Sequence, residues 1–250
     1  MPGKSTQRLD EVLVARGLFA SRSRASDAVK RGTVRVDDAV VTKAGHLIGV
    51  VATLHVDDPA QSYVSRAALK LIAGLDRFDI DVAGQTVLDL GASTGGFTQV
   101  VLERGAARVF AVDVGHGQLH PSLAADPRVV SIENKNAREL TAEDLGNARV
   151  DLIVCDVSFI SLKLALPRAL DLAAPGAQGV FLVKPQFEAG RDAIGKGGLL
   201  KDPEEGPRTA ERLRAWLDVQ PGWQATGLAP SPIEGGDGNK EFLLGGKKNP

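Results

Sequence analysis

The sequence is poor in cysteine and in aromatic residues. A single cysteine, Cys155, excludes a disulfide within the chain and any metal site built from several cysteines. Aromatic residues make up 4% of the 250 residues, so the core is expected to consist mainly of aliphatic side chains. The histidines are scattered, and although His116 and His120 are four residues apart, Gly117 and Pro121 indicate a loop there. We therefore expect no metal site.

A long hydrophobic run is also missing. The longest apolar stretches, such as residues 48–54, are far shorter than the roughly 20 residues that span a bilayer. The N-terminal sequence MPGKSTQRLDEVL has no apolar core behind its basic residues, unlike a signal peptide. We expect a cytoplasmic protein with no membrane partner.

The charge of the chain is nearly balanced but unevenly distributed. A net charge of −1 gives no argument for or against nucleic acid as a partner. Residues 4–35 differ, with a balance of +5 from basic residues Lys4, Arg8, Arg16, Arg22, Arg24, Lys30, Arg31 and Arg35 against Asp10, Glu11 and Asp27. The rest of the chain is therefore net acidic, and a phosphate-binding surface is predicted near the N-terminus.

The first sixty residues predict two short helices followed by a small sheet. Apolar residues at helical spacing end at Gly17, and a second helix is expected from a cap at Ser23 to a stop at Gly32. The segment TVRVDDAVV alternates apolar and polar residues around Asp37-Asp38, which is typical of a hairpin. A further strand is predicted over residues 48–56.

The pattern changes after a polar, proline-containing segment at residues 57–62. We assign residues 1–58 to a first, α+β domain, 59–64 to a linker and 65–250 to a second domain. Strand candidates in the second domain are TVLDLG, RVFAVDV, RVDLIVCDV, GVFLVKP and EFLLGG, and amphipathic stretches occupy residues 97–104, 161–173 and 203–218. This alternation predicts a Rossmann-like, doubly wound α/β fold with a mostly parallel sheet, whose ligands bind beyond the carboxyl ends of the strands.

One of these strands runs into a glycine-rich turn that predicts a nucleoside cofactor. The candidate cofactor-binding residues are Gly91, Ala92, Ser93, Thr94, Gly95, Gly96 and Phe97, together with Asp113 and Asp156. Asp113 comes 22 residues after Gly91, at the end of the next strand, where a carboxylate receives ribose hydroxyls in such folds. A purely structural turn is the alternative. The spacing GxxxGG is neither the dinucleotide fingerprint nor a Walker loop, and it resembles the first motif of S-adenosylmethionine-dependent methyltransferases.

Four charged residues lie near the predicted edge of the sheet. Lys184 and Asp156 end apolar strands, Lys70 lies in a helix leading into the sheet, and Glu241 opens the last strand. Each has an alternative interpretation: Lys70 as a solvated helix residue, Asp156 as a helix cap, and Glu241 as a charge protecting an edge strand. Lys184 is the hardest to explain structurally, because a lysine after five apolar residues is costly to bury without partners.

An ordered series of motifs resembles one family over almost the whole chain. The segments RLDEVLVARGL, SRSRA, YVSRAALKL, VLDLGASTGGFT, CDVSFISL, VKPQFEAG, GKGG, KDPEE and SPIEGGDGNKEFLL resemble the TlyA (haemolysin A) family of ribosomal RNA methyltransferases, whose catalytic domain is FtsJ-like. The resemblance implies S-adenosylmethionine as cofactor, ribose 2′-O-methylation of ribosomal RNA at cytidine, and Lys70, Asp156, Lys184 and Glu241 as the catalytic residues. The chain departs from the family pattern at Ala67-Ala68, Asp37-Asp38 and Lys43-Ala44.

The resemblance also implies an alpha-L RNA-binding domain in residues 8–56. Its candidate phosphate contacts are Arg8, Arg16, Arg22, Arg24, Lys30 and Arg31. Ribosomal RNA or ribosomal subunits would be the partner, recognised by the shape of folded RNA. The alternative interpretation of these residues is a solvated, charged helical surface.

The implied chemistry places Lys184 closest to the attacking 2′-oxygen, Asp156 as the residue that holds Lys184, and Lys70 and Glu241 as residues that orient the hydroxyl. A non-catalytic ribosome-assembly factor with the same fold is the main alternative, and a membrane-lytic haemolysin and a small-molecule methyltransferase are others. A nicotinamide oxidoreductase is disfavoured because the only tyrosine, Tyr63, lacks a Tyr-x-x-x-Lys context. The ribosomal subunit that is modified and the oligomeric state stay open.

Overall fold

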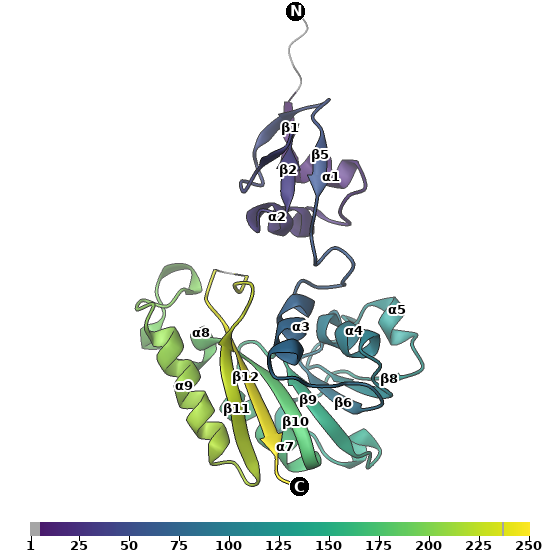
Figure 1. Ribbon diagram of the computed structural model, residues 1–250, viewed down its shortest axis with the longest axis vertical. Coiled ribbons are helices and arrows are strands. Elements are labelled where there is room, and N and C mark those ends of the chain that lie inside the picture. The colour runs from purple at the N-terminus through teal and green to yellow at the C-terminus, as the bar shows by residue number, and fades with distance from the viewer. Residues whose placement is uncertain (1–5, 237) are drawn as a thin grey trace, which may run out of the picture. The chain divides into compact units, whose positions relative to one another are not determined.

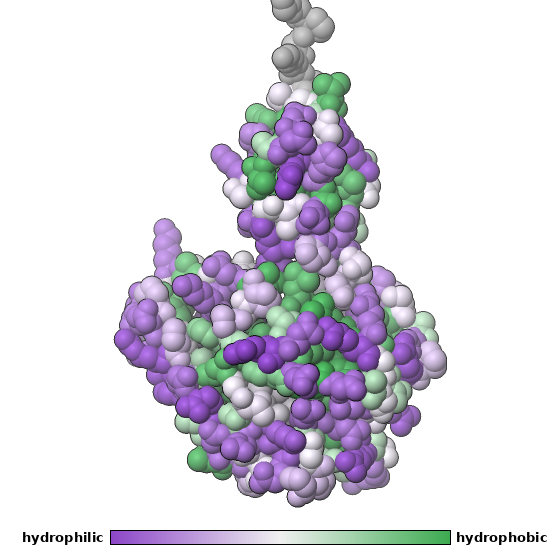
Figure 2. Space-filling model, in the orientation of Figure 1, coloured by the Kyte–Doolittle hydropathy of each residue, from purple (hydrophilic) through white to green (hydrophobic). Residues whose placement is uncertain are grey.

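The computed structural model describes residues 6–236 and 238–250 and divides the chain into two compact units, Met1–Ser62 and Tyr63–Pro250 (Figure 1). Lys4, one of the basic residues counted above, lies outside the described residues. Hydrophilic residues cover most of the displayed face of each unit, with smaller apolar areas between them (Figure 2).

Unit 1 contains two short helices and two small antiparallel sheets. Its elements are β1 Thr6–Arg8, α1 Leu9–Ala15, α2 Arg22–Lys30, β2 Val34–Val36, β3 Ala39–Val40, β4 Leu47–Gly49 and β5 Leu54–Val56. Strand β1 pairs with β4, and β2 lies between β3 and β5. The apolar faces of both helices pack on the sheets in a core that includes Leu9, Leu13, Ala25, Val29 and Val34.

The hairpin turn at Asp37-Asp38 forms as predicted, with positive φ at both residues, but two other expectations for unit 1 are wrong. The cap of α2 is Ser21 and not Ser23, because Ser21 has the extended backbone of a cap and its hydroxyl accepts from Arg24 N at 3.3 Å. The strand predicted over 48–56 is two strands with different partners, because a turn after Gly49 reverses the chain, with Ala52 N donating to Gly49 O at 3.0 Å.

Unit 2 is built around a single sheet of order β11-β12-β10-β9-β6-β7-β8. The strands are β6 Thr86–Leu90, β7 Arg108–Val112, β8 Val129–Ile132, β9 Val150–Cys155, β10 Ala173–Val183, β11 Trp223–Pro230 and β12 Phe242–Lys248. Strands β10, β9, β6, β7 and β8 run parallel, and β12 pairs antiparallel with both β10 and β11. The helices are α3 Ala68–Arg77, α4 Gly96–Glu103, α5 Pro121–Ala124, α6 Leu162–Ala165, α7 Pro167–Leu172, α8 Pro185–Glu188 and α9 Glu205–Asp218, with short 3₁₀ turns η1 Ala137–Glu139, η2 Glu143–Leu145, η3 Arg191–Ala193 and η4 Lys196–Gly198.

Both faces of this sheet are covered, as the sequence predicted for a doubly wound α/β fold. Alternate residues of each strand face opposite sides, so Leu88 and Phe181 pack with α6, α7 and α9, whereas Val87 and Val180 pack with α3, α4 and α5. The separation of the two helical layers is visible in Figure 1. The mostly parallel, doubly wound α/β architecture is therefore confirmed.

Two strands of unit 2 were not predicted. Strands β8 and β11 lie at the two edges of the sheet and are only partly buried, so their apolar signal is weak. Strand β10 also begins at Ala173, six residues before the predicted start at Gly179. None of these differences alters the carboxyl edge of β6, β9 and β10, where the candidate site lies.

Candidate active site

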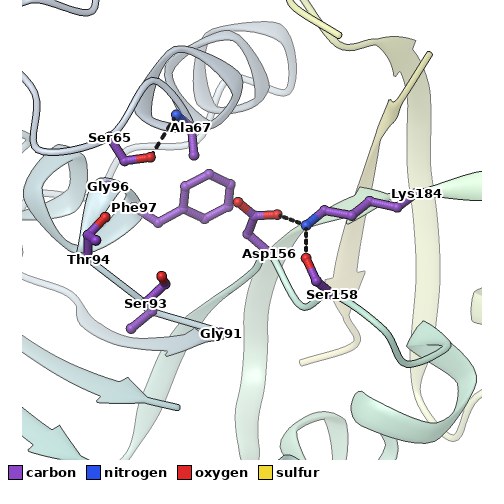
Figure 3. A pocket seen from close by; sticks show the side chains of 11 residues that line it. Ser65, Ala67, Gly91, Ser93, Thr94, Gly96, Phe97, Asp156, Ser158 and Lys184 are labelled. Atoms are coloured by element: carbon purple, nitrogen blue, oxygen red, sulfur yellow. Dashed lines mark hydrogen bonds and ion pairs between the residues drawn. The ribbon is translucent and has the colours of Figure 1, made fainter. Parts of the chain in front are cut away.

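The carboxyl ends of three neighbouring parallel strands meet around one cavity in unit 2 (Figure 3). Strand β6 leads into the glycine-rich turn, β9 into Asp156 and β10 into Lys184. The cavity is lined by Ser65, Ala67, Gly91, Ala92, Ser93, Thr94, Gly96, Phe97, Asp156, Ser158 and Lys184. The structure thus brings together most of the predicted cofactor-binding residues and two of the predicted catalytic ones.

The glycine-rich turn needs its glycines at two positions. Gly91 has φ +79°, and a Cβ there would lie 2.9 Å from the backbone oxygen of Asp156, so the turn lies directly against the end of β9. Gly95 has φ +97° and is covered by the side chains of Leu119 and Leu123, which leave no room for a Cβ. A larger residue at Gly91 would push the turn off the end of β9, whereas one at Gly95 would have to displace the Leu119 and Leu123 side chains and adopt a strained backbone conformation.

Asp113 lies at the end of β7 and braces the same turn. Its Oδ2 accepts from Ser93 N at 2.8 Å and its Oδ1 from Gly115 N at 2.7 Å. Ser93 has a positive φ of 47°, and the bond to Asp113 helps to hold that backbone conformation. Neither Asp113 nor Gly95 is among the residues that line the cavity, although both shape the turn that does.

Lys184 follows β10 and is nearly buried, with 9% of its surface exposed. Its Nζ lies 2.7 Å from Asp156 Oδ1 and donates a hydrogen bond to Ser158 Oγ at 2.7 Å (Figure 3). A carboxylate and a hydroxyl therefore compensate the burial of the ammonium group. The sequence singled out Lys184 and Asp156 but not Ser158, although Ser158 stands two residues after Asp156 in the CDVSF segment.

A second buried ion pair joins helix α3 to the start of β12. Lys70 Nζ lies 2.5 Å from Glu241 Oε2, and the two residues are only 5% and 4% exposed. The antiparallel register of β10 and β12 ends at the pair Val183 and Phe242, so Lys184 and Glu241 occupy the next opposite positions. The two lysine–carboxylate pairs consequently lie at the same edge of the sheet, on adjacent strands.

These contacts overturn two of the alternative interpretations. Lys70 is not a solvated helix residue, because it is buried and paired with Glu241. Glu241 does not protect an edge strand, because β12 lies between β10 and β11 in the interior of the sheet.

Two further titratable groups are fully buried next to the cavity. Burial, together with the charges of Asp156 and Asp113, raises the pKa of Asp89 in β6 to about 7, although a 2.7 Å hydrogen bond from Thr98 Oγ1 opposes the shift. Burial also raises the pKa of the Cys155 thiol to about 12, which leaves it protonated and unreactive at neutral pH. Sequence reasoning assigned no role to Asp89.

An exposed aromatic residue lies beside the cavity. Phe159 is 89% exposed, has a positive φ of 65°, and its ring centroid is 5.0 Å from that of Phe187 in α8. The exposed ring of Phe159 thus directly follows, in the chain, Ser158, the serine that binds the Lys184 ammonium group.

The candidate RNA-binding residues all lie in unit 1, and most make internal contacts. Arg8 and Arg22 pair with Asp10, Arg16 donates to the carbonyl oxygens of Val50 and Ala52, Arg24 donates to those of Ala60 and Gln61, and Arg31 pairs with Asp27 and Asp58. Lys30 is exposed and forms no ion pair among the described residues. Exposed Arg35 and Lys43, which were not proposed as contacts, likewise form none in the described part of the chain.

Neither a multi-residue metal site nor a membrane-spanning helix is found in residues 6–236 and 238–250. No group of three or more histidine, cysteine, aspartate or glutamate side chains there is arranged to hold a metal ion. No helix in these described ranges has the length and apolar character needed to cross a bilayer.

Comparisons with known proteins match each unit separately and the chain as a whole. The FtsJ-like methyltransferase family matches residues 63–248, and the S4 domain matches residues 7–50. The chain is 46% identical over 238 residues to the 16S/23S rRNA (cytidine-2′-O)-methyltransferase TlyA of Mycobacterium tuberculosis, covering 95% of this chain and 88% of that protein. It is 39% identical over 236 residues to Hemolysin A of Brachyspira hyodysenteriae, covering 94% and 98% respectively. A solved structure from Streptococcus thermophilus, provisionally named a haemolysin, matches with a TM-score of 0.75 at 39% identity, covering 99% of this chain and 90% of that one.

Proposed function

The chain belongs to the FtsJ-like methyltransferase family and, within it, to the TlyA family, and from this premise we propose that it methylates the ribose 2′-oxygen of a cytidine in ribosomal RNA with S-adenosylmethionine as methyl donor. The observation that carries the proposal is the pair of lysine–carboxylate contacts at one end of the sheet: Lys184 with Asp156, which line the glycine-turn cavity, and Lys70 with Glu241 on the neighbouring strand. Lys70, Asp156, Lys184 and Glu241 are the proposed catalytic residues.

The residues present fit S-adenosylmethionine as the cofactor. Most of the turn from Gly91 to Phe97 lines the cavity, and the absence of a side chain at Gly91 lets the turn lie directly against the end of β9. Asp113 remains our candidate for the ribose hydroxyls, because a carboxylate oxygen that accepts one backbone N–H keeps further acceptor capacity. When bound, the cofactor supplies an electrophilic methyl group on a sulfonium centre.

A ribose hydroxyl is a weak nucleophile, and in this proposal the two ion pairs stabilise its developing negative charge and orient it. Lys184 stabilises negative charge on the 2′-oxygen as this oxygen attacks the methyl group and its proton passes to water, because an ammonium group in a partly dry site interacts strongly with developing charge. Asp156 and Ser158 hold the Lys184 ammonium in place, and Lys70 with Glu241 orients the hydroxyl from the neighbouring strand. Positioning of the reacting groups provides most of the rate enhancement.

The exposed ring of Phe159 and the basic residues of unit 1 support RNA as the substrate class. The exposed ring of Phe159 beside the cavity offers a face on which a nucleobase can stack. Residues 1–58 would form the RNA-binding domain, residues 59–64 the linker and residues 65–250 the catalytic domain, with phosphate contacts from Arg8, Arg16, Arg22, Arg24, Lys30 and Arg31. The partner would be ribosomal RNA or a ribosomal subunit in the cytoplasm.

The test is transfer of tritium from methyl-labelled S-adenosylmethionine to purified small subunits, large subunits, intact ribosomes and free ribosomal RNA. We expect label on ribose in at least one of these substrates, recovered as 2′-O-methylcytidine after digestion to nucleosides. Lys184→Ala is expected to lower the transfer rate by at least about 100-fold while the cofactor still binds, because stabilisation of the developing oxyanion is lost.

The matched control is Lys247→Ala, which removes an exposed lysine at the far end of β12 and should leave the rate unchanged. Methylation retained in Lys184→Ala would contradict the catalytic assignment. No label on any substrate, despite measurable cofactor binding, would favour a non-catalytic assembly factor.

A further inference from the structure

The segments that follow β9 and β10 are joined by three side-chain contacts in sequence. Lys184 contacts Asp156 and Ser158, and four residues later Glu188 contacts Ser161 and the backbone of Leu162. Between these two contacts, the ring of Phe187 packs against that of Phe159. Of these three contacts, only the one at Lys184 takes part in the proposed chemistry.

Glu188 makes the contact farthest from the cavity and satisfies both of its carboxylate oxygens. Ser161 Oγ donates to Oε2 at 2.5 Å, and Leu162 N donates to Oε1 at 2.7 Å. Ser161 caps helix α6, with its Oγ also accepting from Lys163 N at 3.1 Å, and Leu162 is buried in the core. Glu188 therefore connects the last turn of α8 to the start of α6.

The segment between these anchors is only partly buried, with Val157 packed against the core and the next two residues exposed. Residues 157–160 connect Asp156, whose N donates to Leu90 O at 2.9 Å, to Ser161 and Leu162, which Glu188 holds. Ser158 and Phe159 within it are exposed, and Phe159 has a backbone conformation that costs energy for a residue other than glycine. The position of such a partly exposed segment with a strained residue depends on the contacts that hold its two ends.

We propose that Glu188 is a positioning residue for methyl transfer, which acts by holding the 157–160 segment so that Ser158 meets Lys184. This inference rests on the proposed function, and it deepens it by naming a residue outside the four catalytic groups. Glu188 binds neither substrate nor cofactor in this proposal. Its effect reaches the reaction through Ser158, which shares the Lys184 ammonium with Asp156 (Figure 3).

Glu188→Ala and Glu188→Gln should have different effects on methyl transfer. Glu188→Ala removes both acceptors and releases the start of α6. Glu188→Gln keeps an acceptor for Leu162 N and presents an amide that can donate to Ser161 Oγ, since a hydroxyl both donates and accepts. A positioning role therefore predicts that the Gln variant retains the activity that the Ala variant loses.

The experiment measures kcat for methyl transfer from labelled S-adenosylmethionine to whichever ribosomal substrate the wild type modifies, using the full chain at saturating cofactor. We expect kcat to fall about 10- to 100-fold in Glu188→Ala and less than about 3-fold in Glu188→Gln, because misplacement of about 1 Å has such an effect on catalysis. The cofactor dissociation constant should change less than about 2-fold, since the glycine turn is held by other contacts. Glu139→Ala, which removes an exposed glutamate outside the cavity lining, is the matched control and should behave as wild type.

A double-substitution cycle separates positioning from general stabilisation. If Glu188 acts through Ser158, then Glu188→Ala combined with Ser158→Ala should have about the kcat of the more impaired single variant. Effects that multiply in the double variant, or a Glu188→Ala kcat equal to that of Glu139→Ala, would overturn the inference. A wild type that transfers no methyl group would instead contradict the proposed function.

A third variant covers the case in which Glu188→Ala does not fold. Ser161→Ala removes one of the two donors to Glu188 and leaves the Leu162 N–H bond in place. We expect a folded protein whose kcat is lowered about 3- to 10-fold, because only part of the anchor is lost. A wild-type kcat in Ser161→Ala would count against the inference.

Discussion

At the scale of single residues, the candidate site depends on buried charges that have partners. Lys70 and Lys184 are each within ion-pair distance of a carboxylate, at 2.5 and 2.7 Å. Removing one partner of a buried pair leaves an uncompensated charge, which is more damaging than losing an exposed pair. The four residues are therefore expected to be more sensitive to substitution than any surface lysine or glutamate of unit 2.

Asp89 gives a residue-scale prediction about pH. Burial raises the pKa of Asp89 from 3.8 to about 7, so the folded protein holds this proton more tightly than the unfolded chain does. The resulting stabilisation is fully present below the unfolded pKa and is lost as the pH rises through about 7. Between pH 5 and pH 8 the wild type should lose on the order of 3 kcal/mol from this group.

Asp89→Asn has no such titration and isolates the contribution of Asp89. The free energy of unfolding of the variant relative to wild type should rise by that amount between pH 5 and pH 8, measured by urea denaturation at each pH. Other carboxyl groups cancel in this difference. A difference that stays constant with pH would show that Asp89 is ionised in the folded protein across the whole range.

Single residues were identified unevenly from the sequence, for a physical reason. Asp156 and Lys184 stood out because each ends an apolar strand, and Lys70 and Glu241 were recognised through the family resemblance. Ser158 and Glu188 were missed, because a serine or glutamate in a loop has no periodic pattern that distinguishes a binding role from a solvated one. Asp89 showed no separate sign of a function in the sequence, because it lies within the apolar strand that leads into the glycine-rich turn.

At the scale of elements, the packing of α3 on the sheet sets the position of Lys70. Gly74 lies one turn after Lys70, and a Cβ at Gly74 would come within 2.6 Å of Val180 Cγ1 in β10. The absence of a side chain at Gly74 thus permits the close approach of the helix that carries Lys70. The same approach brings Lys70 Nζ to Glu241 at the start of β12.

Gly74→Ala is predicted to move α3 away from the sheet and to lower kcat by about 10-fold through displacement of Lys70. Overpacking costs about 1–3 kcal/mol, which a gain of about 1 kcal/mol in helix propensity only partly offsets, so the melting temperature should also fall. The measurement is kcat together with thermal unfolding.

Two further variants test the cause. Gly49→Ala makes the same change where a Cβ would meet nothing within 4 Å, and it should leave kcat unchanged. Adding Val180→Ala to Gly74→Ala removes the colliding methyl group and should restore part of the lost activity. If the double variant is no more active than Gly74→Ala, the collision is not the cause.

Strands that are buried on both faces were predicted from the sequence, whereas partly buried strands at the edges of the sheet were not. Strands β6, β7 and β9 follow the predicted segments, because strands covered on both faces appear as continuous apolar runs. Edge strands β8 and β11 are only partly buried and gave no comparable run. The close approach at Gly74 is a property of two elements together, and the sequence of α3 alone does not contain it.

At the scale of the whole molecule, the two units are expected to have separable roles, with unit 1 contributing to RNA affinity and unit 2 to chemistry. The basic residues of unit 1 fall into two groups that the sequence could not distinguish. Arg31 pairs with Asp27 and Asp58 and is half-buried, whereas Lys30, its neighbour in the chain, is exposed without an ion pair among the described residues. The sequence shows the charges, but only the fold shows which of them are already neutralised.

Lys30→Ala and Arg31→Ala should therefore weaken RNA binding in different ways. Lys30→Ala is predicted to raise the dissociation constant for ribosomal RNA and to reduce the slope of log K against log salt by about one, because one phosphate contact is lost. Arg31→Ala leaves the Asp58 carboxylate, 3% exposed, without its guanidinium partner, and should destabilise unit 1 by about 3–5 kcal/mol.

Filter binding at several salt concentrations and thermal unfolding of both variants distinguish these two effects. Lys30→Ala should unfold as wild type does and keep its affinity for the cofactor, because the change is confined to an exposed side chain. Arg31→Ala should lower the unfolding temperature of unit 1. A weaker affinity of this variant for RNA would therefore not by itself indicate a lost phosphate contact. An unchanged salt slope in Lys30→Ala would remove that residue from the proposed RNA surface and move attention to Arg35 and Lys43, two further exposed cations of unit 1 that form no ion pair among its described residues.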